Sequence, residues 1–335
     1  MRYNNTMKKV IFSGIQPTAQ APHIGNYLGA LQQWAGLQES YQPYYCVVDL
    51  HAITVPQEKK KFNESIYATY AMLLAIGLDP NMSNIFVQSH VRQHTELTWI
   101  LNCFTHIGEL NRMTQFKEKS AKQTQIISAG LYDYPVLMAV DILLYHTNII
   151  PVGEDQVQHI ELARDIAERF NNAYGEVFTL PTARIVKESA RIMSLSDPKS
   201  KMSKSDTNQN GTIFLTDKPD IIRKKIMSAV TDLKKSIEFD KTRLGLYNLL
   251  GMYKAVTGKS EKDIENHFSG KGYKEFKSEL SEVLIELIMP IQQKYATYIA
   301  DKTTLEIYMR QNAHKATIVA EQTVRRVKEK LGFII

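Results

Sequence analysis

The sequence predicts an α/β fold of the doubly wound type with a parallel sheet, followed by a smaller all-helical domain. In the first 195 residues, short apolar runs alternate with longer segments whose apolar residues recur every three or four positions. Such alternation predicts a mostly parallel sheet with helices on both faces. Beyond residue 206 only the helical spacing continues. A chain of 335 residues is long enough for two domains, and we expect them at residues 1–205 and 206–335.

The predicted strands are short apolar runs, and the predicted helices are the periodic segments between them. The expected strands are residues 8–14, 44–49, 85–87, 149–152 and 191–195. The first helix is expected to begin near residue 24, and the others span residues 62–76, 96–104, 135–145 and 155–170. Gly77 and Pro80 mark the end of the helix at 62–76.

The second region is expected to hold five helices, at residues 218–230, 247–256, 262–268, 273–293 and 314–331. We expect the last of them to pack back on the first domain. The loop at residues 196–212 is rich in Ser, Lys, Asp and Asn, which is typical of a hinge between domains.

The composition favours a basic globular protein of a reducing compartment. Two cysteines exclude a disulfide scaffold, and no apolar run reaches membrane-spanning length, so we expect a cytoplasmic protein without membrane contact. The net charge of +6 permits a polyanionic partner without proving one. Six cationic side chains between residues 218 and 235 would face either solvent or such a partner: Lys218, Arg223, Lys224, Lys225, Lys234 and Lys235.

A candidate anion site lies where the first strand runs through a loop into a helix that begins His23-Ile24-Gly25-Asn26. A helix N-terminus offers free N–H groups and a partial positive charge. Gly25 lets a ligand approach the backbone closely, and His23 and Asn26 add side-chain donors. The conventional glycine-rich phosphate loops are missing here. The alternative is an ordinary helix start with an incidental histidine.

A second basic motif, Lys201-Met202-Ser203-Lys204-Ser205, follows 178 positions after His23. Two lysines on a serine-rich loop are point charges that can close over a triphosphate. The alternative is a solvated basic loop. The two motifs together predict one ATP site that is clamped from two sides.

The two motifs in this order resemble the class I aminoacyl-tRNA synthetases, which carry both on a Rossmann-like catalytic domain. Within that class, five runs are similar to the bacterial-type tryptophanyl-tRNA synthetases: FSGIQPT (residues 12–18), DLHAIT (49–54), GELNRMTQFKEKS (108–120), YPVLMAVDILLY (134–145) and GEDQVQHI (153–160). The resemblance extends from about residue 10 to the C-terminus. Asn26 replaces the second histidine of the general class motif, as is usual in this family, and residues 1–6 match nothing in it.

The resemblance implies where ATP binds. His23, Asn26, Lys201 and Lys204 would be the catalytic donors, because activation of an amino acid needs positioning and phosphate-charge stabilisation more than a base. The implied ATP contacts are Gln16, Pro17, Thr18, Gly25, Asn26, Gly153, Glu154, Asp155, Ile192, Lys201, Met202, Ser203, Lys204 and Ser205. Mg²⁺ would be held mainly by the ATP phosphates, so we expect no dedicated protein metal site.

The amino-acid pocket is expected around Asp141, which shares a helix face with Tyr134 and Met138 at spacing i, i+4, i+7. A carboxylate in such apolar surroundings needs a donor. The resemblance implies that Asp141 accepts the indole N–H of L-tryptophan, with Tyr134, Met138, Phe12, Val48, His51 and Gln156 around the substrate. The alternative is a salt-bridged core aspartate.

The implied reaction joins L-tryptophan to ATP as tryptophanyl-adenylate, releases pyrophosphate and passes the acyl group to tRNA(Trp). Residues 206–335 would bind the tRNA near its anticodon, and the enzyme would be a homodimer. A tyrosine-activating relative, a small nucleotidyltransferase and a non-catalytic RNA-binding paralogue are the alternatives. The presence of His23, Asn26, Lys201 and Lys204 speaks against the paralogue.

Overall fold

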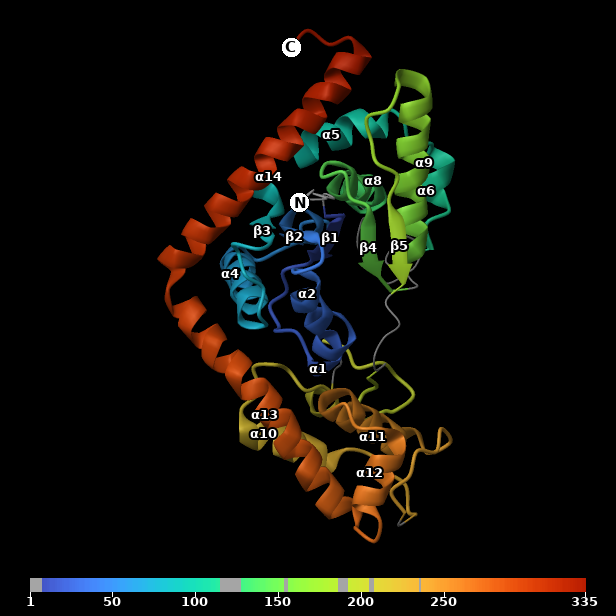
Figure 1. The fold of residues 1–335 in the computed structure, drawn as a ribbon, viewed down its shortest axis with the longest axis vertical. Coiled ribbons are helices and arrows are strands. Elements are labelled where there is room, and N and C mark those ends of the chain that lie inside the picture. The colour runs from blue at the N-terminus through green and yellow to red at the C-terminus, as the bar shows by residue number, and fades with distance from the viewer. Residues whose placement is uncertain (1–7, 115–127, 154–155, 186–191, 205–207, 235) are drawn as a thin grey trace, which may run out of the picture.

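The computed structural model describes residues 8–114, 128–153, 156–185, 192–204, 208–234 and 236–335. Its centre is a parallel sheet of five strands in the order β3-β2-β1-β4-β5 (Figure 1). The strands are β1 (Val10–Ile15), β2 (Gln42–Val47), β3 (Asn84–Val87), β4 (Ile149–Val152) and β5 (Thr182–Ile185). The predicted doubly wound fold is therefore confirmed.

The strand order reverses between β1 and β4, which pair through Ile11 and Ile149. The chain winds outward from β1 to β2 and β3 on one side, and from β4 to β5 on the other. In open α/β sheets, ligands bind at such a reversal, outside the carboxyl ends of the strands. The topology therefore points to the ends of β1 and β4 as the binding edge.

Helices cover both faces of the sheet, and alternate strand residues enter two different cores. On β2, Tyr45 and Val47 belong to one core with α4 (Lys59–Ala75), whereas Tyr44 and Cys46 belong to the other. The second core contains α5 (Gln93–Asn102), α8 (Ala129–Leu143) and α9 (Val157–Tyr174). The shorter helical segments of this half are α1 (Ile24–Asn26), η1 (Tyr27–Leu31), α2 (Gln32–Leu37), α3 (Asp49–Ala52), η2 (Gln88–His90) and α6 (Ile107–Asn111).

The strand predicted at residues 191–195 is wrong. The fifth strand is β5, which pairs with β4 along Ile149 to Val152. Because β5 is an edge strand with mostly exposed side chains, it lacks the apolar signature of a buried strand. Ile192 and Leu195 are apolar because they pack in the first core. Among the described residues 192–195, only Met193 forms an isolated bridge, with Lys201.

After residue 208, the described part of the chain is helical and holds no strand. Its helices are η4 (Gln209–Gly211), α10 (Pro219–Ser228), α11 (Leu244–Thr257), α12 (Glu261–Phe268), α13 (Tyr273–Ala300) and α14 (Lys302–Leu331). The last two are longer than predicted, and they run end to end along one side of the molecule (Figure 1). No described helix is long and apolar enough to cross a membrane.

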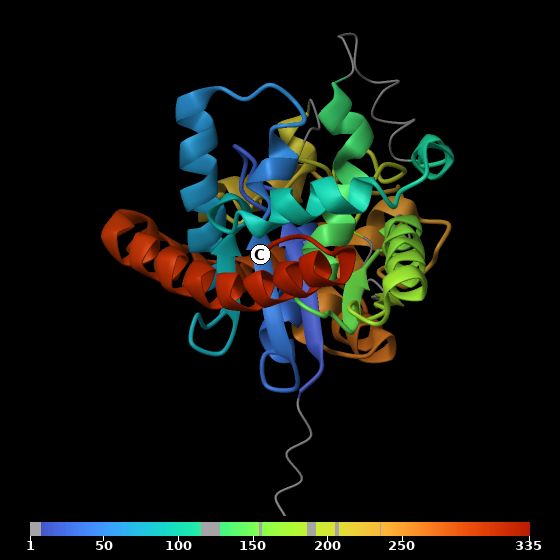
Figure 2. The same ribbon diagram turned by 90° about the horizontal axis from the view of Figure 1, so that it is seen from above.

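Helices α13 and α14 tie the two regions together. Helix α13 packs against α10 and α11 at one end and against α4 at the other, and the first core continues into the helical region. Helix α14 lies along β3 and α5, across the sheet-containing part of the molecule (Figure 2). Thr323 donates to the Leu144 carbonyl over 2.8 Å, and Lys328 pairs with Glu96 at 2.7 Å.

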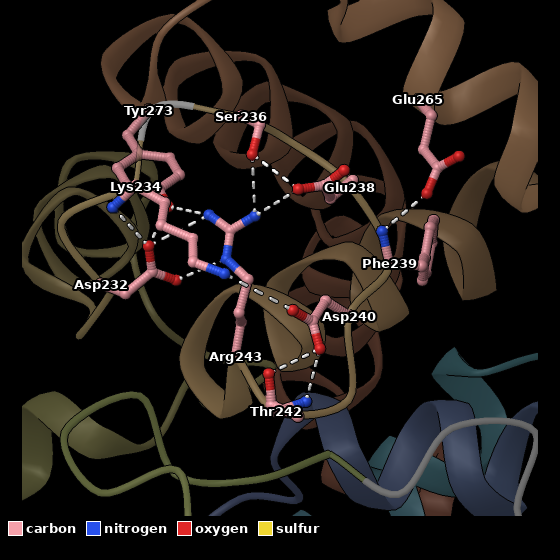
Figure 3. A network of polar contacts seen from close by, with 10 residues as sticks. All are labelled: Asp232, Lys234, Ser236, Glu238, Phe239, Asp240, Thr242, Arg243, Glu265 and Tyr273. Atoms are coloured by element: carbon pink, nitrogen blue, oxygen red, sulfur yellow. Dashed lines mark hydrogen bonds and ion pairs between the residues drawn. The ribbon is translucent and has the colours of Figure 1, made fainter.

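The loop between α10 and α11 is organised by one buried arginine (Figure 3). Arg243 is 5% exposed, and its guanidinium pairs with both carboxylate oxygens of Asp232, at 2.8 and 3.0 Å. Tyr273 donates to the same carboxylate over 2.8 Å. Hydrogen bonds from Arg243 and Tyr273 hold the pKa of Asp232 well below its usual range. This loop is therefore fixed by a polar network in addition to the apolar packing of Ile237 in the first core.

The basic cluster of residues 218–235 is not uniformly exposed. Lys225 is 6% exposed and reaches the Thr212 carbonyl and Asp217 Oδ2, both at 2.7 Å. Arg223 pairs with Glu282 on α13 at 2.7 Å. The expectation that all six cations face solvent or a polyanion is therefore wrong for Lys225; Lys235 lies outside the described residues.

Candidate active site

Two adjoining cavities lie at the carboxyl ends of β1 and β4, where the topology predicts binding. One has a volume of about 440 Å³ and the other about 420 Å³. Six residues line both cavities: Gly14, Gln16, Trp34, Pro151, Val152 and Gly153. Two ligands bound side by side would therefore meet at the ends of these strands.

The His23 turn forms one wall of the second cavity. His23 caps α1: its Nδ1 accepts from the Asn26 backbone N–H over 3.2 Å, and Asn26 Oδ1 accepts from the His23 N–H over 3.1 Å. Gly25 lines the cavity, and a Cβ on it would lie 3.0 Å from His23 Nδ1. Only glycine fits this turn without moving the histidine.

The imidazole of His23 is uncharged at neutral pH. Burial, and next the charges of Lys204 and Lys201, lower the pKa of His23 to about 4. Because Nδ1 accepts from the Asn26 backbone, the proton of the neutral ring is on Nε2. His23 is 4% exposed and is not among the residues that line the cavity, so it supports the turn from behind and adds no charge.

The lysine loop lies beside the loop that leads into this turn, although the two are 186 positions apart in the sequence. Lys204 Nζ donates to Thr18 Oγ1 over 2.8 Å, and both residues line the second cavity with Lys201. Burial lowers the pKa of Lys204 to about 8. The motifs at His23 and Lys201 therefore flank one cavity.

Backbone pairing explains how the two motifs are held together. The segment after the lysine loop forms a short antiparallel contact with the turn: Ile24 N–H donates to Ile213 O, and Leu215 N–H donates to Pro22 O, both over 2.9 Å. Thr212 Oγ1 donates to the Ser203 carbonyl over 2.9 Å. Lys225 in turn holds the Thr212 carbonyl, so α10 supports the lysine loop through Thr212.

The ATP residues expected from the sequence divide into three groups. Gln16, Thr18, Gly25, Asn26, Gly153, Lys201 and Lys204 line the second cavity. Pro17, Ile192, Met202 and Ser203 do not line it; Ile192 and Met202 are 2% exposed and belong to the first core, although Ile192 packs beside Gly25. Glu154, Asp155 and Ser205 lie outside the described residues.

All seven residues expected around the amino acid line the first cavity: Phe12, Val48, His51, Tyr134, Met138, Asp141 and Gln156. They come from β1, the start of α3, helix α8 and the turn before α9. Asp141 is 2% exposed and accepts from His51 Nε2 at 2.8 Å, from His94 Nδ1 at 2.7 Å and from Gln88 Nε2 at 2.6 Å. The structure therefore places a buried carboxylate with three donors at the wall of an otherwise largely apolar cavity.

The sequence prediction missed three polar residues at this site. Gln88 and His94 hold Asp141 from outside the cavity. Ser13 lines the cavity, and its buried hydroxyl has no hydrogen-bond partner among the described residues. Gln88 directly follows β3, and a polar residue at the carboxyl end of an apolar strand was the available signal. His94, within α5, offered no comparable signal.

No group of three or more metal-ligating side chains occurs in the part of the chain that the structure describes. His159 Nε2 lies 3.0 Å from the Tyr134 hydroxyl, and Asp155, four positions before it, is outside that part. Among its described residues, the second cavity is lined by two lysines and by no carboxylate. Its donor set fits phosphate, not a bare divalent cation.

Comparison with known proteins gives a consistent result. Residues 4–288 match the model of the family described as tRNA synthetases class I (W and Y). The chain is 50% identical to the Tryptophan--tRNA ligase of Listeria monocytogenes over 327 residues, which cover 97% of this chain and 98% of that protein. It is 48% identical to the ligase of the same name from Clostridium tetani, covering 98% and 97% of the two chains.

Two crystal structures share the fold closely. One is a tryptophanyl-tRNA synthetase from Mycoplasma pneumoniae, with a TM-score of 0.88 and 37% identity over 98% of this chain and 99% of that chain. The other is the enzyme from Campylobacter jejuni complexed with ADP and tryptophan, with a TM-score of 0.86 and 36% identity over 97% and 100% of the two chains.

Proposed function

Because the chain belongs to the class I tRNA synthetases for tryptophan and tyrosine, we propose that it joins L-tryptophan to tRNA(Trp) with ATP. The first step forms tryptophanyl-adenylate and releases pyrophosphate, and the second transfers the acyl group to the tRNA. The observation that carries the proposal is the pair of adjoining cavities, one holding a buried acid and the other two lysines and the His23 turn.

In the proposed mechanism, the carboxylate of tryptophan attacks the α-phosphorus of ATP, and the bond to pyrophosphate breaks. The shared wall of the two cavities would bring these reacting groups together, which supplies proximity and orientation. Lys201 and Lys204 would stabilise the negative charge that develops on the leaving pyrophosphate. The backbone at Gly25 would donate to phosphate oxygens from the opposite side.

The Lys204–Thr18 hydrogen bond suggests how the loop engages ATP. A lysine with a pKa near 8 has a partner in Thr18 that carries no charge. A phosphate oxygen is a stronger acceptor for an ammonium group than a hydroxyl is. ATP would therefore draw Lys204 from Thr18 to the phosphates, and Mg²⁺ would arrive coordinated by those phosphates.

Tryptophan would bind in the first cavity with its indole N–H donating to Asp141 Oδ2. Phe12, Val48 and Met138 would pack against the ring system, and His51 would share the same carboxylate oxygen. A site built to accept one N–H rejects side chains that lack it by about 10⁴-fold. The pocket therefore favours tryptophan over phenylalanine without a separate editing site.

We also propose that residues 206–335 form a tRNA-binding domain and that the protein acts as a cytoplasmic homodimer. The lysines at 218, 224 and 234 remain available in part for RNA phosphates. Trp99 on α5 and Ile107 on α6 are 74% and 70% exposed, and exposed large apolar side chains of this kind are typical of a protein interface. Cys46 and Cys103 are unpaired thiols, as expected in a reducing compartment.

The test is ATP–pyrophosphate exchange by the purified protein with L-tryptophan and with L-tyrosine, followed by charging of a tRNA(Trp) transcript. Exchange with tryptophan and charging of the transcript are expected. Exchange with tyrosine alone would identify the tyrosine-activating alternative, and no exchange with either amino acid would favour the RNA-binding paralogue.

A further inference from the structure

Two side chains that do not line the amino-acid cavity hydrogen-bond to Asp141 on the side away from the cavity. Gln88 and His94 both approach Asp141 Oδ1, at 2.6 and 2.7 Å, and both are completely buried. The other oxygen, Oδ2, lies 2.8 Å from Nε2 of His51, which does line the cavity. One carboxylate oxygen is thus held by the protein interior, and the other lies on the cavity side.

The imidazole of His94 is fixed at both nitrogens. A carboxylate only accepts, so Nδ1 carries the proton that it donates to Asp141. Nε2 lies 2.8 Å from the Tyr145 hydroxyl. Burial raises the pKa of Tyr145 well above its ordinary value, so the phenol keeps its proton and can donate to Nε2. The Tyr145 ring stacks on Tyr44 with 4.5 Å between centroids, which fixes the outer end of this hydrogen-bond chain.

The network leaves a single acceptor position for a ligand. A carboxylate offers about four positions, two on each oxygen. Gln88 and His94 fill those on Oδ1, and His51 fills one on Oδ2. The network also keeps the acid ionised: burial raises the pKa of Asp141, but the hydrogen bonds from His51 and His94 outweigh burial and lower the pKa to about 2.

We propose that His94 is a positioning residue that selects substrates with a ring N–H, because it holds Asp141 with Oδ2 facing the cavity. His94 does not touch the substrate and acts only through Asp141. The proposal rests on the proposed function, in which Asp141 accepts the indole N–H. Without His94, the carboxylate can turn or take up a proton, and an aromatic side chain that lacks a ring N–H is rejected less strongly.

Two substitutions separate the contacts of His94. Asn carries its amide nitrogen as many bonds from Cα as Nδ1 does, so His94→Asn keeps a donor toward Asp141 and loses Tyr145. Gln carries its amide nitrogen at the position of Nε2, so His94→Gln keeps the contact with Tyr145 and loses the donor to Asp141. The Asn variant is therefore the matched control for the Gln variant.

The assay is ATP–pyrophosphate exchange with L-tryptophan and with β-(1-benzothiophen-3-yl)-L-alanine, in which sulfur replaces the ring N–H. The ratio of the two kcat/KM values measures the preference for the N–H. His94→Gln is expected to lower this ratio about 10- to 100-fold, mainly through the KM for tryptophan. His94→Asn is expected to keep the ratio within about threefold of the wild-type value, and neither variant should change the KM for ATP.

If kcat/KM in His94→Gln falls equally for both substrates, so that their ratio stays at the wild-type value, the proposal is overturned. A histidine that only supports the fold would give that result. If the Gln variant does not fold, His94→Leu, which also lacks a donor toward Asp141, decides instead: a reduced ratio with an unchanged KM for ATP supports the role of His94, and an unchanged ratio overturns it. If the wild-type protein itself shows no preference for tryptophan over the analogue, the assignment of Asp141 in the proposed function fails, and the role of His94 fails with it.

Discussion

The substitution Asp141→Asn removes the charged acceptor of the proposed indole site while keeping the size of the side chain. The indole N–H would lose a hydrogen bond to a carboxylate, which contributes about 1.5–3 kcal/mol, or about 10- to 150-fold in affinity. The new amide also brings N–H groups toward His51, His94 and Gln88, which all donate to the acid in the wild-type protein. One of these donors would be left without an acceptor, which costs about a further 1–3 kcal/mol.

These two costs appear in different measurements. The unsatisfied donor is already present in the free protein, so it lowers the free energy of unfolding. The lost indole contact lowers kcat/KM for tryptophan, by about 10²-fold, with the KM for ATP within about threefold of the wild-type value. Asp133→Asn is the matched control, because Asp133 is on the same helix and hydrogen-bonds Asn102 at 2.9 Å, away from the cavity.

The assay is pyrophosphate exchange at varied tryptophan with saturating ATP, together with thermal unfolding of both variants. A tryptophan KM in Asp141→Asn equal to that of Asp133→Asn would refute the assignment of Asp141 to the indole. An equal rise in the KM values for tryptophan and ATP would refute the separation of the two cavities.

Four further predictions concern the lysine loop and the helical region. Lys204→Ala should slow adenylate formation about 10²–10³-fold and leave tryptophan affinity unchanged, and Lys204→Arg should retain more activity; normal turnover with weak tryptophan binding would contradict the role of Lys204 at the phosphates. Because burial lowers the pKa of Lys204 to about 8, its charge is lost as the pH rises through that value. The kcat/KM for ATP should therefore fall above about pH 8 in the wild-type protein but not in Lys204→Arg. A flat wild-type pH profile would contradict a role for the Lys204 charge. Lys225→Met should lower both the melting temperature and the single-turnover rate of adenylate formation, because Lys225 supports the loop through Thr212, whereas the exposed neighbour Lys224→Met should change neither; equal effects of the two would contradict this. Arg243→Ala should lower the free energy of unfolding by about 1–3 kcal/mol in denaturant titration, whereas Arg310→Ala, which breaks an exposed pair with Glu306, should have no measurable effect.

The sequence predicted those parts of the fold whose burial is local. Residues 149–152 were assigned correctly as β4, because an apolar run of strand length ends there at Gly153. β5 was missed because an exposed edge strand carries no apolar run. Residues 191–195 were assigned wrongly as a strand because a segment buried in the core can carry an apolar run without pairing in a sheet. Length and apolarity alone do not distinguish these cases.

Lys225 shows a signal that was present but not used. It lies on the buried face of its helix, three positions after Ile222 and one before Ile226, which are both buried. Its periodic position therefore indicated burial, whereas its charge indicated solvent. The partner that makes burial tolerable, Asp217, lies only eight positions before it.

The cavity around Asp141 could be predicted in part. Spacing along α8 placed Tyr134, Met138 and Asp141 on one face, and the apolar surroundings of Asp141 predicted that it needs donors. The donors themselves come from segments 47 to 90 positions away, brought together by the sheet. No local pattern specifies such contacts, and the resemblance to a known family supplied only His51.

A crystal structure with L-tryptophan and a non-hydrolysable ATP analogue would test the central claim most directly. The indole nitrogen should lie within about 3.2 Å of Asp141 Oδ2, with Lys204 released from Thr18 and within the same reach of a phosphate oxygen. An indole nitrogen facing any other group, or phosphates remote from the lysine loop, would contradict the proposed site.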